Sequence, residues 1–144
     1  MVFVRDEGSL FDAPVQTIWR YLQADDAHSP SHKGRRNFER ELLTDNSAML
    51  SWEQEVDGKW IHMSNKLTFH PPLGFMVEPL EGPMAGSKFF NLYIPKGKQT
   101  EVVVVGDWTS KTIPPAQLEK AVWANLEKVF HEDTEGLKAF GKSR

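Results

Sequence analysis

The sequence predicts an α+β fold in which a curved antiparallel sheet of six to seven strands wraps around a long C-terminal helix, with one or two short helices after the first strand. Two observations predict it. Apolar residues recur at helical spacing through residues 113–141, whereas the middle of the chain alternates with the period of two that is typical of half-buried strands. Because these strands follow one another in hairpins, an antiparallel sheet is expected.

The N-terminal part predicts a strand followed by a short helix. Residues 2–12 fit a strand that is bulged near Gly8. Asp12 is a candidate acidic cap for a helix over residues 14–23, in which Pro14 suits the first turn. The apolar residues of this helix fall at i, i+3, i+4 and i+7: Val15, Ile18, Trp19 and Leu22.

The central hairpin is the part of the sheet whose register the sequence predicts. Residues 47–56 and 59–70 flank Asp57-Gly58, a dipeptide that favours a two-residue turn because both residues tolerate positive φ. If Val56 pairs with Lys59, one face of the hairpin is apolar and the other is charged. The apolar face contains Leu50, Trp52, Met63, Leu67 and Phe69, and it also carries Gln54 and Asn65.

The other strands are predicted by shorter patterns. Strands are expected over residues 36–44 and 73–80, followed by a hairpin of 87–94 and 100–110 around a loop at 95–98. The register of this second hairpin stays open, because its loop length is ambiguous. Val102 to Val105 form a continuous β-branched run, which is typical of a central, buried strand.

The C-terminal helix is expected to begin near Pro115, which suits a first turn. Its apolar stripe consists of Leu118, Val122, Leu126, Val129, Phe130, Leu137 and Phe140, with Glu132 among the polar residues outside it. Asp133 falls within the stripe. Either its carboxylate reaches water where the helix leaves the core, or it points into an enclosed space, where an unpaired carboxylate would have a raised pKa.

Composition sets limits on function. The 144 residues predict a single domain, residues 1–144, and the formal charge of −3 offers no basic field for nucleic acid. The one basic cluster, Lys33-Gly34-Arg35-Arg36, is interpreted as a solvated loop. The chain has no cysteine, no apolar run of roughly 20 residues, and acids from Asp6 onward. We therefore expect a cytoplasmic protein without membrane insertion.

The order of elements and the segment Leu10-Phe11-Asp12-Ala13-Pro14-Val15-Gln16-Thr17-Ile18-Trp19-Arg20-Tyr21-Leu22 resemble the helix-grip superfamily (SRPBCC). This superfamily includes START lipid-transfer domains, pollen-allergen-like proteins and polyketide cyclases. The resemblance implies a deep, mostly apolar cavity between the long helix and the concave sheet. It does not imply one chemistry, because the fold hosts many.

Two histidines and two amides are the candidate polar groups. His28 and His32 are four residues apart, but Pro30 argues against a regular helix and no third histidine is nearby. They are therefore placed at the cavity mouth, and neither a metal nor a cofactor is expected. Gln54 and Asn65 either orient a ligand or bond to each other, to backbone or to water.

The leading hypothesis is a carrier or sensor for a hydrophobic small molecule, apolar or aromatic and lipids included, acting as a monomer or homodimer. Its predicted ligand-binding residues are Trp52, Gln54, Met63, Asn65, Leu67, Tyr93, Trp108, Val122, Leu126, Val129 and Asp133. One alternative is a polyketide cyclase/dehydratase-like enzyme, in which Asn65, Gln54, Asp133 and His28 position a substrate and move protons. The other is a protein-interaction or co-chaperone module. Whether the protein is an enzyme stays open.

Overall fold

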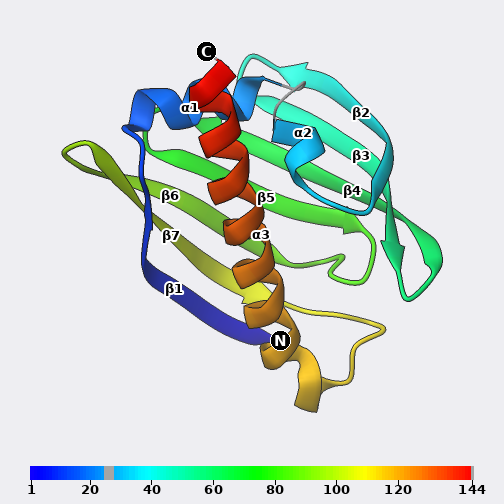
Figure 1. Ribbon diagram of the computed structural model, residues 1–144. Helices are drawn as coiled ribbons and strands as arrows, with labels where there is room; N and C mark the ends of the chain where they lie inside the picture. The colour runs from blue at the N-terminus through cyan, green and yellow to red at the C-terminus, as the bar shows by residue number, and fades with distance from the viewer. Residues whose placement is uncertain (25–27, 144) are drawn as a thin grey trace.

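The fold was obtained as a computed structural model, which describes residues 1–24 and 28–143 (Figure 1). Residues 25–27 of the loop expected after the first helix lie outside this description. The elements are β1 (Val2–Phe11), α1 (Val15–Gln23), α2 (His28–Ser31), β2 (Arg35–Thr44), β3 (Ser47–Val56), β4 (Lys59–His70), β5 (Gly74–Glu81), β6 (Lys88–Lys96), β7 (Gln99–Trp108) and α3 (Pro115–Ser143).

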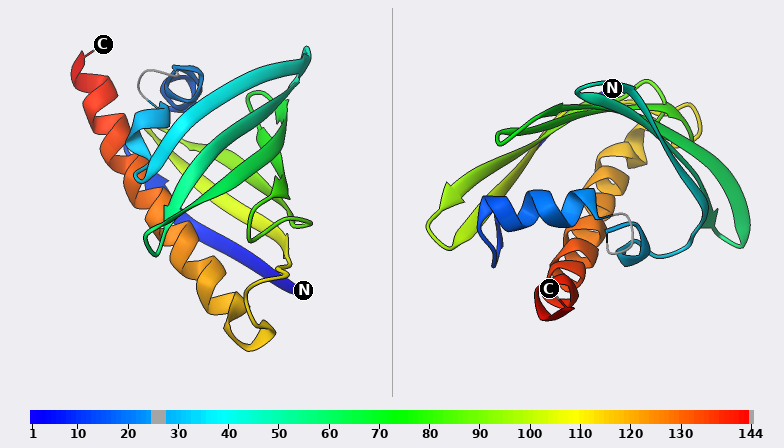
Figure 2. Two further views of the ribbon diagram at one scale, coloured as in Figure 1. Left: turned by 90° about the vertical axis from the view of Figure 1, so that its right-hand side faces the viewer. Right: turned by 90° about the horizontal axis from the view of Figure 1, so that it is seen from above.

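The seven strands form one antiparallel sheet in the order β1-β7-β6-β5-β4-β3-β2. Six of the strands form a meander of hairpins, and β1 joins its end by pairing with β7. Figure 2 shows that the sheet curves around α3 and that α1 lies on the same concave side. The predicted fold class is confirmed. The bulge expected near Gly8 is also present, as a shift in the β1–β7 register between Asp6 and Ser9.

The predicted register of the β3–β4 hairpin is confirmed. Val56 pairs with Lys59, and the ladder continues from there to Ala48 and Leu67 without a shift. Asp57 and Gly58 have φ values of 51° and 78°. Both are the positive values that the two-residue turn requires. The turn therefore determines which side chains face the concave side.

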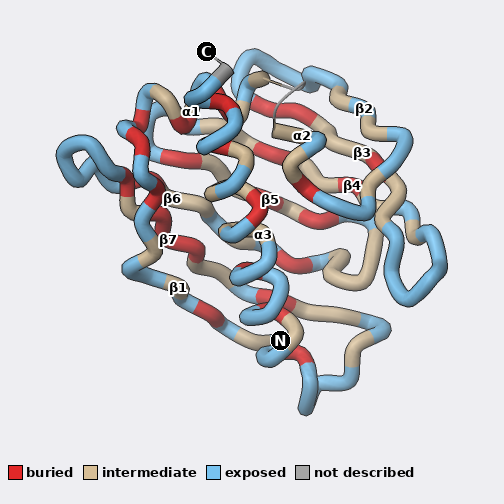
Figure 3. The backbone as a smooth tube through the Cα atoms, viewed as in Figure 1, coloured by how far each residue is buried: buried red, intermediate tan, exposed pale blue. Residues whose placement is uncertain are grey.

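Helix α3 packs its apolar stripe against one half of the sheet. Leu118, Val122, Leu126, Leu137 and Phe140 are buried together with side chains of β1, β6, β7 and α1. In Figure 3, buried positions recur along α3 between exposed ones. Many of the exposed positions carry charged residues. Among the described residues no helix is long and apolar enough to cross a membrane.

One local prediction about the helices is wrong. Asp12 does not cap α1; the cap residue is Pro14, whose carbonyl oxygen accepts hydrogen bonds from the backbone N–H groups of Thr17 and Ile18 at 3.0 and 3.2 Å. Pro30 lies in α2, a single helical turn of four residues and not a longer regular helix. First-turn N–H groups have no acceptor within their own helix, so a proline there loses no hydrogen bond.

Candidate functional site

A cavity of about 210 Å³ lies between the helices α1 and α2 and the β2–β5 half of the sheet. Its apolar wall consists of Trp19, Leu22, Phe38, Leu42, Leu50, Leu67, Phe69, Pro71 and Phe75. Its polar residues are Gln23, His28, Ser29, Arg35, Arg40, Asp45, Asn46 and Ser47. Leu42, Asp45 and Asn46 are exposed around the β2–β3 turn, so the cavity reaches solvent on that side.

Aromatic side chains make part of this wall rigid. Trp19 of α1 packs edge-on against Phe69 and Phe75, with ring centroids 6.4 Å apart in both pairs. Its indole N–H also donates to the carbonyl oxygen of Pro72 at 3.1 Å. Edge-to-face pairs at such distances are favourable beyond the area that they bury. The wall is therefore preorganised by its own packing.

Arg35 places a positive charge in the cavity wall. Its guanidinium carbon lies 4.3 Å from the ring centroid of Trp52, a cation–π distance. Within the described part of the chain, its Nε is buried without a hydrogen-bond partner. Burial lowers the pKa of Arg35, and the negative charges of Glu132 and Asp133 oppose that shift. Interpreting Lys33–Arg36 as a solvated loop is therefore wrong for Arg35, which begins β2 and faces the interior.

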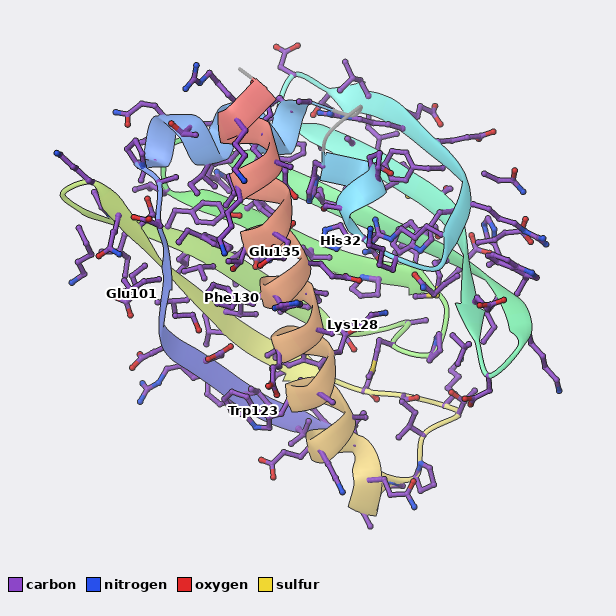
Figure 4. All side chains as sticks on the ribbon, in the orientation of Figure 1. His32, Glu101, Trp123, Lys128, Phe130 and Glu135 are labelled. Atoms are coloured by element: carbon purple, nitrogen blue, oxygen red, sulfur yellow. The ribbon has the colours of Figure 1, made fainter. Side chains whose placement is uncertain are left out.

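A second polar group joins α2 to α3 beside the cavity. Nε2 of His28 and Nε2 of His32 lie 3.1 Å apart, and they are 3.4 and 3.1 Å from Oδ1 of Asp133. The Tyr21 hydroxyl is 3.0 Å from the same Oδ1. Figure 4 shows His32 next to α3, on the side where α2 packs. His28 also lines the cavity, so this cluster borders it.

Glu132 binds the ring nitrogen of His32 that faces away from Asp133. Its Oε1 is 2.9 Å from His32 Nδ1, and its Oε2 accepts the backbone N–H of Lys33 at 3.0 Å. Burial by itself would raise the pKa of Glu132, but these hydrogen bonds outweigh it and the pKa is lowered. Glu132 was expected on the polar side of α3 and is instead buried, because the segment around His32 covers it.

Asp133 is neither at the surface nor unpaired. Burial would raise the pKa of its carboxyl group, but hydrogen bonds and charge interactions with His28 and His32 outweigh burial and lower the pKa well below its usual range. The expectation that this carboxylate reaches water is therefore wrong, since its side chain is only 15% exposed. The alternative, an enclosed position, is confirmed, but the carboxylate is paired, so its pKa moves in the opposite direction to that of an unpaired buried acid.

The predicted ligand-binding residues fall into separate regions. Leu67 and His28 line the cavity, whereas His32, expected at its mouth, is buried in the cluster with Asp133. Tyr93, Trp108, Val122 and Leu126 belong to the hydrophobic core. None of the α3 residues that the structure describes lines this cavity. The reason is that α3 packs on the β1–β7–β6 half of the sheet, and the space remains over β2–β5.

The other predicted residues lie outside the cavity wall, on the β3–β4 hairpin or, for Val129, on α3. Trp52 is buried beneath Arg35, and its indole N–H donates to Oε1 of Gln54 at 3.2 Å. Gln54 in turn donates to the backbone carbonyl oxygens of Lys33 and Gly34, both at 3.1 Å. Of the alternatives for Gln54, hydrogen bonding to the backbone is therefore the one observed. Half-buried positions are taken by Met63, Asn65 and Val129. Ligand contact by these residues stays a prediction.

Sequence reasoning missed several residues of the site. Arg35, Arg40 and Glu132 were interpreted as solvated charges or given no role. Arg35 pairs with Gln54, but two register shifts lie between this pair and the β2–β3 turn, so the strand period alone does not give the pairing. No local pattern marks Glu132, because its partners His32 and Lys33 are about one hundred residues away in sequence.

Several solved structures are similar to this chain. TTHA0849 from Thermus thermophilus has a TM-score of 0.77 at 19% identity, over 96% of this chain and 98% of that one. The Zhui aromatase/cyclase from Streptomyces sp. R1128 has a TM-score of 0.74 at 13% identity, over 99% and 96%. A START superfamily protein from Mycobacterium smegmatis has a TM-score of 0.74 at 11% identity, over 96% and 98%.

No protein-family model and no curated protein sequence matches the chain. At identities of 19% and below, the structural likeness concerns the fold and not the activity. It covers nearly the whole chain and includes the curved sheet, the short helices after β1 and the long terminal helix. The chain therefore has the START-like helix-grip fold.

Proposed function

We propose that this protein binds a small aromatic or apolar molecule in the cavity between α1, α2 and β2–β5. The observation that carries the proposal is the make-up of the wall: packed aromatic rings and aliphatic side chains surround the guanidinium group of Arg35, whose Nε is buried. Ligand sites are usually preformed, mostly apolar hollows with a few polar groups that fix orientation.

The size of the cavity narrows the ligand class. A dry apolar cavity of about 150 Å³ accommodates benzene, and pockets for drug-sized ligands start at about 300 Å³. The cavity here, at about 210 Å³, lies between these values. We infer a ligand of one or two rings, and not an extended chain.

Arg35 indicates the polar end of that ligand. A buried guanidinium group with a free N–H favours an oxygen acceptor, and charge-assisted hydrogen bonds of this kind are roughly twice as strong as neutral ones. Arg40, which also lines the cavity, adds positive charge. The ligand proposed is therefore an aromatic carboxylate, phenolate or carbonyl compound.

Filling the cavity is expected to weaken ligand binding. Leu50→Phe adds a ring to the wall, and we expect 2-naphthoate, titrated by calorimetry, to bind the unmodified protein and to bind this variant at least roughly tenfold more weakly. Leu80→Phe is the matched control, because Leu80 is exposed on β5 and lies outside the cavity wall. If both variants bind 2-naphthoate with equal affinity, the probe does not bind in this cavity.

Removing the guanidinium group of Arg35 is expected to affect charged ligands selectively. For Arg35→Met we expect a roughly 10- to 100-fold loss in affinity for 2-naphthoate, from the about 1.5–3 kcal/mol of a hydrogen bond to a charged group. Affinity for neutral 2-naphthamide should change far less. Arg36→Met is the control, since Arg36 is exposed and pairs with Glu53 and Trp60 on the outer face. The same loss for both ligands would contradict a polar role for Arg35.

A cyclase- or dehydratase-like enzyme is the second candidate. One observation favours it: His28, in the cavity wall, is paired with Asp133, an arrangement suited to proton transfer. The likeness to the Zhui aromatase/cyclase is compatible with it at the level of fold. Release of a cyclised or dehydrated product from a short poly-β-keto probe would distinguish this enzyme from a carrier.

A further inference from the structure

Three atoms of the kinds that bind metals converge where α2 meets α3. They are Nε2 of His28, Nε2 of His32 and Oδ1 of Asp133, and their separations are 3.1, 3.4 and 3.1 Å. Two of the three residues come from one short segment and the third from a helix about one hundred residues later. The fold, and not a local motif, assembles the group.

The spacing of these atoms fits a single ion. Nitrogen and oxygen ligands bind Zn²⁺ at about 2.0–2.2 Å. Two such atoms lie about 3.0 Å apart at right angles about the ion and about 3.4 Å apart at the tetrahedral angle. The observed separations fall within this range. We propose that His28, His32 and Asp133 form a binding site for a divalent transition-metal ion that prefers imidazole ligands, such as Zn²⁺ or Fe²⁺.

Neighbouring side chains orient two of these three candidate ligands, His32 and Asp133, through hydrogen bonds. Glu132 accepts from His32 Nδ1 at 2.9 Å, which directs the Nε2 lone pair toward the other two atoms. Tyr21, at 3.0 Å from Asp133 Oδ1, steadies the carboxylate. Metal-bound histidines and carboxylates are commonly oriented by such partners.

Hydrogen bonding without a metal is the competing explanation for the close approach of these three atoms. With Nδ1–H directed to Glu132, neutral His32 would turn a lone pair toward an ionised carboxylate oxygen only 3.1 Å away. A cation bound between the three atoms makes that contact favourable. The alternative is a set of hydrogen bonds without a metal, in which an imidazole N–H donates to the other Nε2, 3.1 Å away, or to Asp133. The titration described below separates the two.

The ligand set restricts which ion is bound. Two imidazoles and one carboxylate suit zinc and iron, whereas Mg²⁺ and Ca²⁺ prefer oxygen ligands only. Three protein ligands leave positions open for water or for an oxygen of a bound molecule. Because His28 also lines the cavity, those positions lie near the proposed ligand, although the metal site itself does not depend on that ligand.

The test is titration of the full chain, freed of metal by a chelator, with Co²⁺ as a spectroscopic probe and then with Zn²⁺. We expect visible d–d absorption that saturates at one Co²⁺ per chain and is abolished by Zn²⁺. Metal should also raise Tm by roughly 5 to 10 °C at a hundredfold excess over Kd. If the unmodified protein shows no saturable binding, the proposal is overturned and the hydrogen-bonded arrangement without a metal remains.

Substitutions of single residues test whether the bound ion lies at these three side chains. His28→Gln changes the most exposed of the three ligands, with 26% of its side chain accessible, and should weaken binding at least roughly a hundredfold. Glu132→Gln should weaken it roughly 10- to 100-fold, because it acts through His32. His131→Gln is the control, since His131 is exposed on α3. Near-ultraviolet circular dichroism verifies that each variant is folded. Unchanged binding in His28→Gln, or an equal loss in His131→Gln, overturns the assignment.

Discussion

Replacing Gly74 by alanine is expected to lower the free energy of unfolding by about 3 to 5 kcal/mol. Gly74 begins β5 with φ at +147°, a backbone conformation that side chains rarely adopt. An added Cβ would also overlap the carbonyl oxygen of Asn91 and lie 3.0 Å from Cα of Leu92. These are backbone atoms of β6, so the clash is relieved only by shifting one strand relative to the other.

Urea denaturation followed by tryptophan fluorescence measures this loss. With m between about 1 and 3 kcal/mol/M, the midpoint should fall by roughly 2 M. Gly97→Ala is the matched control, because Gly97 also has positive φ, at +68°, but nothing lies within 4 Å of its added Cβ. We expect a loss of only about 1–2 kcal/mol there. Equal losses in the two variants would show that the close approach of β5 to β6 has no energetic consequence.

The fold was largely predictable because its signals are local. The two-residue turn at Asp57-Gly58 and the period of two fix the β3–β4 register, and they place Leu50, Leu67 and Phe69 on the concave face, where all three line the cavity. The β6–β7 hairpin could not be aligned in the same way. Its strands run to Lys96 and resume at Gln99, so part of the expected loop belongs to the strands.

The site was less predictable, because it depends on contacts between distant segments. The register shows which side chains face inward, but not which half of the sheet α3 covers. That half holds Tyr93 and Trp108, and for this reason these two predicted cavity residues, like Val122 and Leu126 of α3, are core residues. Asp133 did carry a signal, as a charge within an apolar stripe. Its partners, His28 and His32, become visible only when α2 is placed against α3.

Asp133→Ala is expected to destabilise the protein by about 3 to 5 kcal/mol, even without metal. The carboxylate faces three groups, Tyr21 at 3.0 Å, His32 at 3.1 Å and His28 at 3.4 Å. Its side chain is only 15% exposed, so water replaces it poorly. Removing it leaves buried polar groups without their acceptor, and this cost exceeds the net value of the interactions themselves.

Urea unfolding in the presence of a chelator measures this effect apart from any metal binding. Asp133→Asn keeps an oxygen acceptor of nearly the same shape, and we expect a smaller loss, about 1–3 kcal/mol. Glu135→Ala is the control on the same helix, because Glu135 is exposed and its pairing with Lys138, at 3.5 Å, is a surface contact worth about 0.5 kcal/mol or less. If Asp133→Ala costs no more than Glu135→Ala, the carboxylate does not hold α2 to α3. The cluster would then be a loose surface feature, and the preorganisation on which metal binding depends would be absent.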